Sequence, residues 1–326
     1  MKKLVAFLVL GLSIALLPVE SFAVQTKPPT STSWYVNYIS GDTDSVLNSW
    51  MYNKGYEAGQ TDLNTVGTQS SVAVLYFGQP EIQGSTYGAT GYGRFLSTSV
   101  LINAVTQFAS GYYWGAGSDT TSQMRIVIGT SNHGSYVTYA HGQAWIQLVK
   151  DATTAISSYS SQVSVRGGSD IEVGYSSPST AYSWVDGYSS GFLSPYYLYN
   201  FGDAGGCPQS GTTSNPGNCN NSWTQENVEY VSWGASPMYP LPEIYSTAGG
   251  NAKQWQQITL YSYLAHSRDM FVMAPLSQSG ACTQRTCIPG TENTPQNAWN
   301  QLLTELNSDS RTAESLWWST DIKWRQ

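Results

Sequence analysis

Short runs rich in Val, Ile, Tyr and Phe alternate along the chain with longer stretches whose apolar residues have helical spacing. The short runs have the length and the β-branched and aromatic content that are typical of strands. We predict eight strands, at residues 34–39, 72–77, 125–128, 170–175, 196–200, 228–232, 243–246 and 270–274.

The longer stretches predict helices between most of these strands. The predicted helices are residues 44–52, capped by Asp42 or Thr43, and residues 95–112, 142–156, 178–188, 252–264 and 296–306. Alternation of strand and helix favours a parallel sheet with right-handed crossovers. Eight such units in about 300 residues predict an α/β fold of the (β/α)8 TIM-barrel type. A long irregular loop is expected at residues 202–222.

The chain shows no internal repeat and no linker, so residues 34–326 are expected to form a single barrel domain. A basic start, an apolar run and a small-residue cleavage motif ending at Ala23 predict a signal peptide over residues 1–23. Residues 24–33 are expected to be a disordered entry segment. The Trp-rich stretch 315–326 is expected to pack back on the barrel. The mature protein is therefore predicted to be secreted and extracellular.

Composition narrows the classes of partner. The formal net charge of −7 argues against nucleic acid and anionic membrane surfaces. No apolar run after the signal peptide approaches 18 residues, so no membrane partner is expected once it is cleaved. Charged residues make up only 11% of the chain, whereas it has 23 Tyr and 12 Trp. Such rings either fill a core or stack on the apolar faces of sugars.

Four cysteines lie in the second half of the chain, and three disulfide pairings are open to them. The spacing favours two local loops, Cys207–Cys219 and Cys282–Cys287, in stretches rich in Gly, Pro, Ser, Thr and Asn. The spacing does not match a zinc site, and an exported chain favours disulfides.

The segment Asp170-Ile171-Glu172 is the strongest candidate for catalysis. In a strand, residues i and i+2 point to the same side, so both carboxylates would face the barrel interior. The carboxyl end of a barrel strand is where active sites of this fold lie. Two close acids repel when both are ionised, which raises one pKa and suits a general acid. Glycoside hydrolysis uses such a pair.

This segment resembles the D-x-E strand of family 25 glycoside hydrolases, the secreted lysozyme-like muramidases. It is also similar to the end of the D-x-x-D-x-D-x-E strand of family 18 chitinases, without the upstream acids. The resemblance implies that Glu172 is the acid and Asp170 its partner. The Asp that the family 25 pattern has near the end of the first strand is not present, because Asn37 lies there.

Scattered strand-end pieces are similar to glycosidase-like barrels of Gram-positive secreted proteins. These pieces are residues 34–38, 75–80, 233–236 and 254–257. The resemblance covers most of residues 34–275 and implies the fold more specifically than the activity.

Further polar and aromatic residues follow the predicted strands and are expected to line a cleft at the same mouth. They are Gln79, Glu81, Tyr175, Asp203, Trp233 and Glu243. Together with secretion, the family 25 resemblance implies that the partner is polysaccharide or peptidoglycan, bound by a monomer. His133, His141 and His266 form no H-E-x-x-H pattern, so neither a metal nor a cofactor is expected.

Two other functions are compatible with the sequence. The missing acid after the first strand favours a barrel that binds glycan without cleaving it. A secreted serine hydrolase is the second alternative, because residues 187–191 fit G-x-S-x-G and Ser189, Asp203 and His266 follow the chain order of α/β-hydrolases. That motif requires a strand entering the turn, whereas residues 181–186 have a helical pattern.

Overall fold

The computed structural model describes residues 25–91, 93–192 and 194–326, and the predicted signal peptide lies outside them. Its centre is an eight-stranded parallel sheet with the strand order β10-β11-β1-β2-β6-β7-β8-β9, curled into a half-barrel. The predicted α/β class with a parallel sheet is confirmed. The strands are β1 (Ser31–Tyr35), β2 (Ser70–Tyr76), β6 (Gln123–Ser131), β7 (Val163–Asp170), β8 (Leu198–Asn200), β9 (Met238–Pro240), β10 (Leu276–Ser277) and β11 (Thr320–Trp324).

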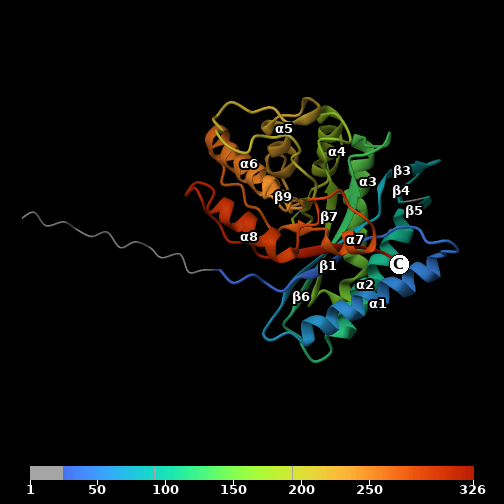
Figure 1. Ribbon diagram of the computed structural model, residues 1–326. Helices are drawn as coiled ribbons and strands as arrows, with labels where there is room; N and C mark the ends of the chain where they lie inside the picture. Colours follow the sequence, from blue (N-terminus) through green and yellow to red (C-terminus); the bar gives the residue numbers. More distant parts are fainter. Residues whose placement is uncertain (1–24, 92, 193) are drawn as a thin grey trace, which may run out of the picture.

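Helices connect successive strands and lie on the outside of the sheet (Figure 1). They are α1 (Asp44–Leu63), α2 (Thr98–Ala116), α3 (Tyr139–Ala155), α4 (Pro178–Ser190), α5 (Gln225–Glu229), α6 (Gly250–His266), α7 (Ser279–Gln284) and α8 (Pro295–Leu306), with short helical turns η1 (Ser157–Tyr159), η2 (Asn220–Ser222) and η3 (Tyr230–Gly234). A smaller antiparallel sheet, β3 (Gln79–Gln83), β4 (Thr86–Gly91) and β5 (Arg94–Ser97), follows β2.

Hydroxyl side chains begin several of these helices. Thr43, one of the two expected caps, accepts a hydrogen bond from the Val46 amide at the start of α1. Ser177 does the same for α4, directly before Pro178 in the first turn. These caps satisfy amide groups that have no partner within the helix. Each cap fixes the residue at which the helix begins, and so the end of the loop that connects the preceding strand to it.

The two faces of β7 show how the sheet separates two apolar clusters. A side chain at Gly167 would meet the Tyr188 hydroxyl of α4 at 2.5 Å, whereas one at Gly168 would meet Val127 at 2.4 Å on the concave face. Val127 belongs to the smaller cluster enclosed by the curled sheet, and Tyr188 to the larger cluster under the helices. Even-numbered residues of β7, including Asp170, therefore point to the concave side.

Residues 228–232 were predicted to be a strand, and this prediction is wrong. They belong to α5 and to the π-helical turn η3. Thr224 and Asn227 form a reciprocal capping box that starts α5. A short apolar run does not distinguish a buried helix from a strand, and here the cap decides for the helix.

The predicted strands at residues 243–246 and 270–274 are also not formed. Glu243 makes only an isolated bridge with Leu276 of β10. The eighth strand is β11. It lies in residues 315–326, which were expected only to pack against the barrel, and it pairs with β1 from Ser31 to Tyr35. β1 thus starts inside the segment that was expected to be disordered. Backbone hydrogen bonds from Leu276 to Pro242 (2.8 Å) and from Ile244 to Leu276 (2.9 Å) link the segment after β9 to β10.

Both favoured disulfides are present, Cys207–Cys219 and Cys282–Cys287. The first lies in the long irregular segment after β8, and the second joins Cys282 of α7 to Cys287, which follows the helix. Within the described residues, the structure has no helix whose length and apolar content would let it cross a membrane.

Candidate active site

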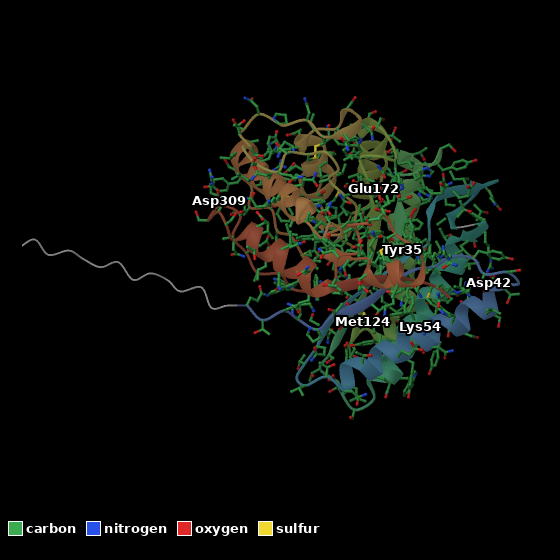
Figure 2. The ribbon with its side chains drawn as sticks, viewed as in Figure 1. Tyr35, Asp42, Lys54, Met124, Glu172 and Asp309 are labelled. Atoms are coloured by element: carbon green, nitrogen blue, oxygen red, sulfur yellow. A yellow bond between two sulfur atoms is a disulfide. The ribbon has the colours of Figure 1, made fainter. Side chains whose placement is uncertain are left out.

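Three carboxylates meet at the carboxyl ends of the strands. Asp170 is the last residue of β7, Glu172 lies two residues further on, and Glu243 follows β9. One oxygen from each lies within 4.8 Å of the others. Asp170 and Glu243 are only 5% and 7% exposed, and Glu172 is half-buried. Figure 2 shows Glu172 between the outer-edge residues Asp42 and Asp309.

The position of Asp170 and Glu172 differs from the prediction. β7 spans Val163–Asp170, so the strand ends where it was expected to begin, and Glu172 lies in the following loop. Asp170 faces the concave side as expected, but the i, i+2 relation of a strand does not place Glu172. The pair is brought together by the loop instead.

Amide side chains from neighbouring strands hold this loop. The Glu172 amide donates to the Asn132 side chain (3.0 Å), which donates in return to the Glu172 carbonyl (2.9 Å). The Ile171 amide donates to Asn200 of β8 (3.3 Å), and the Val173 amide donates to Asp203 (3.2 Å). The backbone of the loop is thereby fixed from both sides.

Burial and mutual repulsion raise the pKa values of the whole cluster. Burial raises the pKa of Glu172 to about 7, and the charge of Asp203 adds to the rise, while a hydrogen bond with Tyr175 opposes it. The pKa values of Asp170 and Glu243 are raised well above their ordinary ranges by burial and by the other acids. The cluster therefore retains at least one proton near neutral pH.

The raised pKa of Glu172 also affects folding. Between its ordinary value of 4.5 and about 7, the folded state binds more protons at this group than the unfolded state does. Its contribution to stability is complete below pH 4.5 and is lost as the pH rises through 7. The cluster thus favours proton transfer at the expense of stability at alkaline pH.

Aromatic and polar groups surround the acids. The Tyr175 ring packs edge-on against His133 with a centroid separation of 5.2 Å. His133 Nδ1 lies 2.6 Å from Gln79 Oε1. On the opposite side, a hydrogen bond connects Tyr245 to the Glu243 carboxyl. Tyr175, 39% exposed, and His133 are the parts of this wall that are open to solvent.

The predicted substrate-binding residues divide into two sets. Tyr175, Asp203 and Glu243 lie at the acid cluster. Gln79 lies at the edge of the cluster, where it contacts His133, which packs against Tyr175. Glu81 lies on β3, where it pairs with Gly88, and no described contact joins it to the cluster. Trp233 lies in η3 and packs against Tyr239 (5.3 Å), so it does not follow a sixth strand as predicted.

The proposed serine triad is not assembled. Ser189 lies inside α4, not at a strand-to-helix turn. The partner of His266 is Glu226, with 2.8 Å between Nε2 and Oε2, and the Asp203 carboxylate accepts from Val173. Neither contact forms the serine–histidine–aspartate relay that this chemistry needs.

Four residues of the site were missed from the sequence. They are Asn132, His133, Asn200 and Tyr245. Asn132 and His133 directly follow β6, which runs to Ser131 and not to 128 as predicted. The polar run after a buried strand was the available signal, and ending the strand too early concealed it.

The three acids are also the residues that could hold a metal ion. Carboxylate oxygens are the ligands that Mg²⁺ and Ca²⁺ prefer. The absence of a metal was predicted from the histidine and cysteine patterns, which do not test a carboxylate site. A cation would need these groups deprotonated, whereas burial favours their protonated forms.

Comparisons with known proteins give only distant matches. No family model matches the chain, and no curated protein matches it. A GH18 chitinase from Pseudoalteromonas aurantia is similar in structure, with 12% identity, 91% of this chain and 94% of that chain covered, and a TM-score of 0.45. A catalytic domain of family GH53 from Ignisphaera aggregans matches at 10% identity, with 81% and 76% covered and a TM-score of 0.33.

A third match is a fungal β-1,4-galactanase, at 9% identity, with 89% of this chain and 62% of that chain covered and a TM-score of 0.27. None of these three proteins is described as a muramidase of family 25. At these values the matches carry no argument about activity.

Proposed function

We propose that the protein is a secreted glycoside hydrolase in which Glu172 is the general acid and Asp170 its partner. The observation that carries the proposal is a half-buried carboxyl with a pKa of about 7 among acids within 4.8 Å. Glycosidic bond cleavage needs one carboxyl to protonate the leaving oxygen and a second to stabilise or attack the sugar cation. Glu243 is the third acid of the cluster, and burial and the neighbouring acids raise its pKa well above the ordinary range.

The fold and the partners belong to the same proposal. We infer that the half-barrel is a closed (β/α)8 barrel, since backbone hydrogen bonds join the segments at its two edges. The protein acts outside the cell as a monomer, after removal of residues 1–23, on cell-wall or other extracellular polysaccharide. Tyr175, Asp203 and Gln79 contribute to the sugar cleft.

The direct test is incubation of the purified chain with peptidoglycan, chitin, β-1,4-galactan and other glycans. Release of new reducing ends supports the hydrolase. Addition of a chelator such as EDTA should leave the rate unchanged, because the proposed mechanism routes no step through a metal. Cleavage that EDTA abolishes would assign the three acids to a cation instead.

The spacing of the acids predicts the stereochemistry. Retaining glycosidases have carboxyl groups about 5–5.5 Å apart, whereas inverting enzymes leave roughly 6.5–9.5 Å for a water. The oxygens of this cluster lie within 4.8 Å, so we expect retention of the anomeric configuration. Proton NMR of the first product formed from a β-linked glycan should show the β-anomer before mutarotation. Initial release of the α-anomer would contradict this assignment of the pair.

The activity should depend on pH with an upper limit set by Glu172. Its raised pKa of about 7 leaves the carboxyl protonated below that value and ionised above it. We expect kcat/KM to fall about tenfold per pH unit above 7, so by about 100-fold at pH 9. A rate profile from pH 4 to 10 checks this, and a flat profile up to pH 9 would exclude Glu172 as the acid.

A glycan-binding barrel without activity is the second candidate. Asn37, two residues beyond β1, stands where the resemblance expects an acid, and its side-chain oxygen is buried without a partner. Sedimentation of the chain with a polysaccharide, without release of reducing ends, would favour this function. Fluorophosphonate labelling of Ser189 would overturn both candidates, and the unassembled triad gives no reason to expect it.

A further inference from the structure

A cavity lies near the amino ends of the strands, whereas the acid cluster lies at their carboxyl ends. Its volume is about 360 Å³. Its lining combines two arginines with aromatic side chains. The residues are Arg125, Arg166, Tyr197, Tyr199, Trp233, Tyr239, Phe271, Met273 and Trp317.

The sheet register gives the position of this cavity. Arg166 and Asp170 lie on the same concave face of β7, because residues i and i+4 of a strand point to one side. At about 3.3 Å per residue, four residues separate them by roughly 13 Å along the strand. Arg125 of β6 pairs with Ser164, so it lies still nearer the amino ends of the strands. The cavity and the acid cluster are therefore separate sites inside one curled sheet.

The two guanidinium groups in the cavity have no carboxylate partner among the described residues. Arg125 donates to the Tyr199 hydroxyl (3.1 Å), and Arg166 donates to the Val165 carbonyl (2.7 Å). The Nε of each is buried without a partner. Burial and the charge of Arg125 lower the pKa of Arg166.

This arrangement is costly unless an anion completes it. Like charges brought together and partly desolvated repel each other, and an unpaired buried donor lowers stability further. The rest of the chain is acidic, with a net charge of −7. Arg125 lies over the Trp318 ring (4.4 Å) and Arg166 over the Tyr197 ring (5.6 Å), but no carboxylate of the described residues pairs with either. Two such arginines in an acidic protein therefore indicate a place that takes negative charge from outside the chain.

The aromatic walls restrict what that anion can be. Trp233 packs edge-on against Tyr239 (5.3 Å) and Phe271 against Trp317 (5.7 Å). Trp317 is 54% exposed, which is unusual for so large an apolar side chain. Flat rings next to guanidinium forks suit a ligand that has a ring face and a carboxylate.

We propose that this cavity is a binding site for a ring compound bearing one carboxylate, held by Arg125 and Arg166 and stacked on the aromatic wall. Two sources have this chemistry: a uronic acid unit of an acidic polysaccharide and a free aromatic acid. The guanidinium forks bind the planar carboxylate, and the rings cover its apolar face. The site is independent of the proposed hydrolase activity, which uses the other ends of the strands.

Isothermal titration calorimetry of the full chain with sodium glucuronate, sodium benzoate and glucose tests the proposal. We expect saturable binding of a carboxylate ligand and none of neutral glucose. Preference for glucuronate identifies the polysaccharide source, and preference for benzoate the aromatic acid. The double variant Arg125→Gln, Arg166→Gln should bind the carboxylate at least about tenfold more weakly, because it lacks the charge-assisted hydrogen bonds.

Two controls make the result decisive. Arg285→Gln removes an exposed arginine that stacks on Trp324 outside the cavity (3.7 Å), and it should leave binding unchanged. Should the double variant fail to fold, Trp317→Ala removes an exposed wall and should weaken binding by itself. No saturable binding of either carboxylate, equal binding of glucose, or equal affinity in Trp317→Ala would overturn the proposal. Glu172→Gln should bind as the parent does, which separates this result from that of the hydrolase assay.

Discussion

Glu172→Gln is expected to lower the rate of glycan cleavage by roughly 10²–10⁴-fold while the chain stays folded. The amide keeps the size of the side chain but cannot donate a proton to the leaving oxygen. The Asn132 hydrogen bonds involve the backbone of residue 172, so they do not depend on the carboxyl group. Removing a half-buried acid from a repelling cluster should also leave stability unchanged or raise it above pH 7.

The measurement compares kcat/KM of parent and variant on whichever glycan the parent cleaves. Glu57→Gln is the matched control, because this exposed carboxylate on α1 pairs only with Lys54. The residual kcat/KM of Glu172→Gln should no longer fall as the pH rises above 7. A variant with more than about half of the parent rate, or with an unchanged upper limb, would assign the acid role to another group.

Asp42→Ala should destabilise the fold by about 3–5 kcal/mol, the largest stability effect that we expect from one substitution. Asp42 and Arg325 form an ion pair in which each side chain is only 2% exposed. Arg325 also donates to the Asn37 carbonyl (3.1 Å) and lies over the Trp50 ring. Loss of the carboxylate would leave a guanidinium buried without its counter-charge.

Urea unfolding at pH 7, followed by circular dichroism, measures this difference. Asp309→Ala is the matched control, since the exposed pair of Asp309 and Arg311 should contribute far less than the buried pair does. Burial acts to raise the pKa of Asp42, but its bonds to Arg325 and the charge of Arg325 lower it overall. Its contribution should therefore be lost as the pH falls below 4. Equal destabilisation by the two substitutions would show that the buried pair contributes no more than a surface pair.

Several elements of the fold were predictable because local signals agree there. β2, β6 and the helices α3, α4 and α8 were each predicted within a few residues, since apolar spacing and capping residues indicate the same element. The strands β9 and β10, which were not predicted, are three and two residues long, and so short a run carries no periodicity. Their positions are set by pairing with neighbouring strands, which is not visible in one sequence.

The site was predictable in its residues more than in its geometry. Asp170 and Glu172 were identified by their spacing, but the loop that joins them is held by Asn132 and Asn200 from other strands. Glu243 was placed on a strand that does not form, yet it lies at the acid cluster. Chemical type is visible in a sequence, whereas convergence depends on which strands are neighbours.

Strand β11 has a consequence for how the molecule is made. It consists of residues near the end of the chain and lies between β10 and β1, with Thr320 opposite Ser31. Strand β1 therefore has no neighbour on this side until residues 320–324 have been synthesised. Contacts of such long sequence separation slow folding. The parallel sheet therefore stays open at this edge of β1 while the intervening chain is made, which keeps the complete fold from forming before β11 is available.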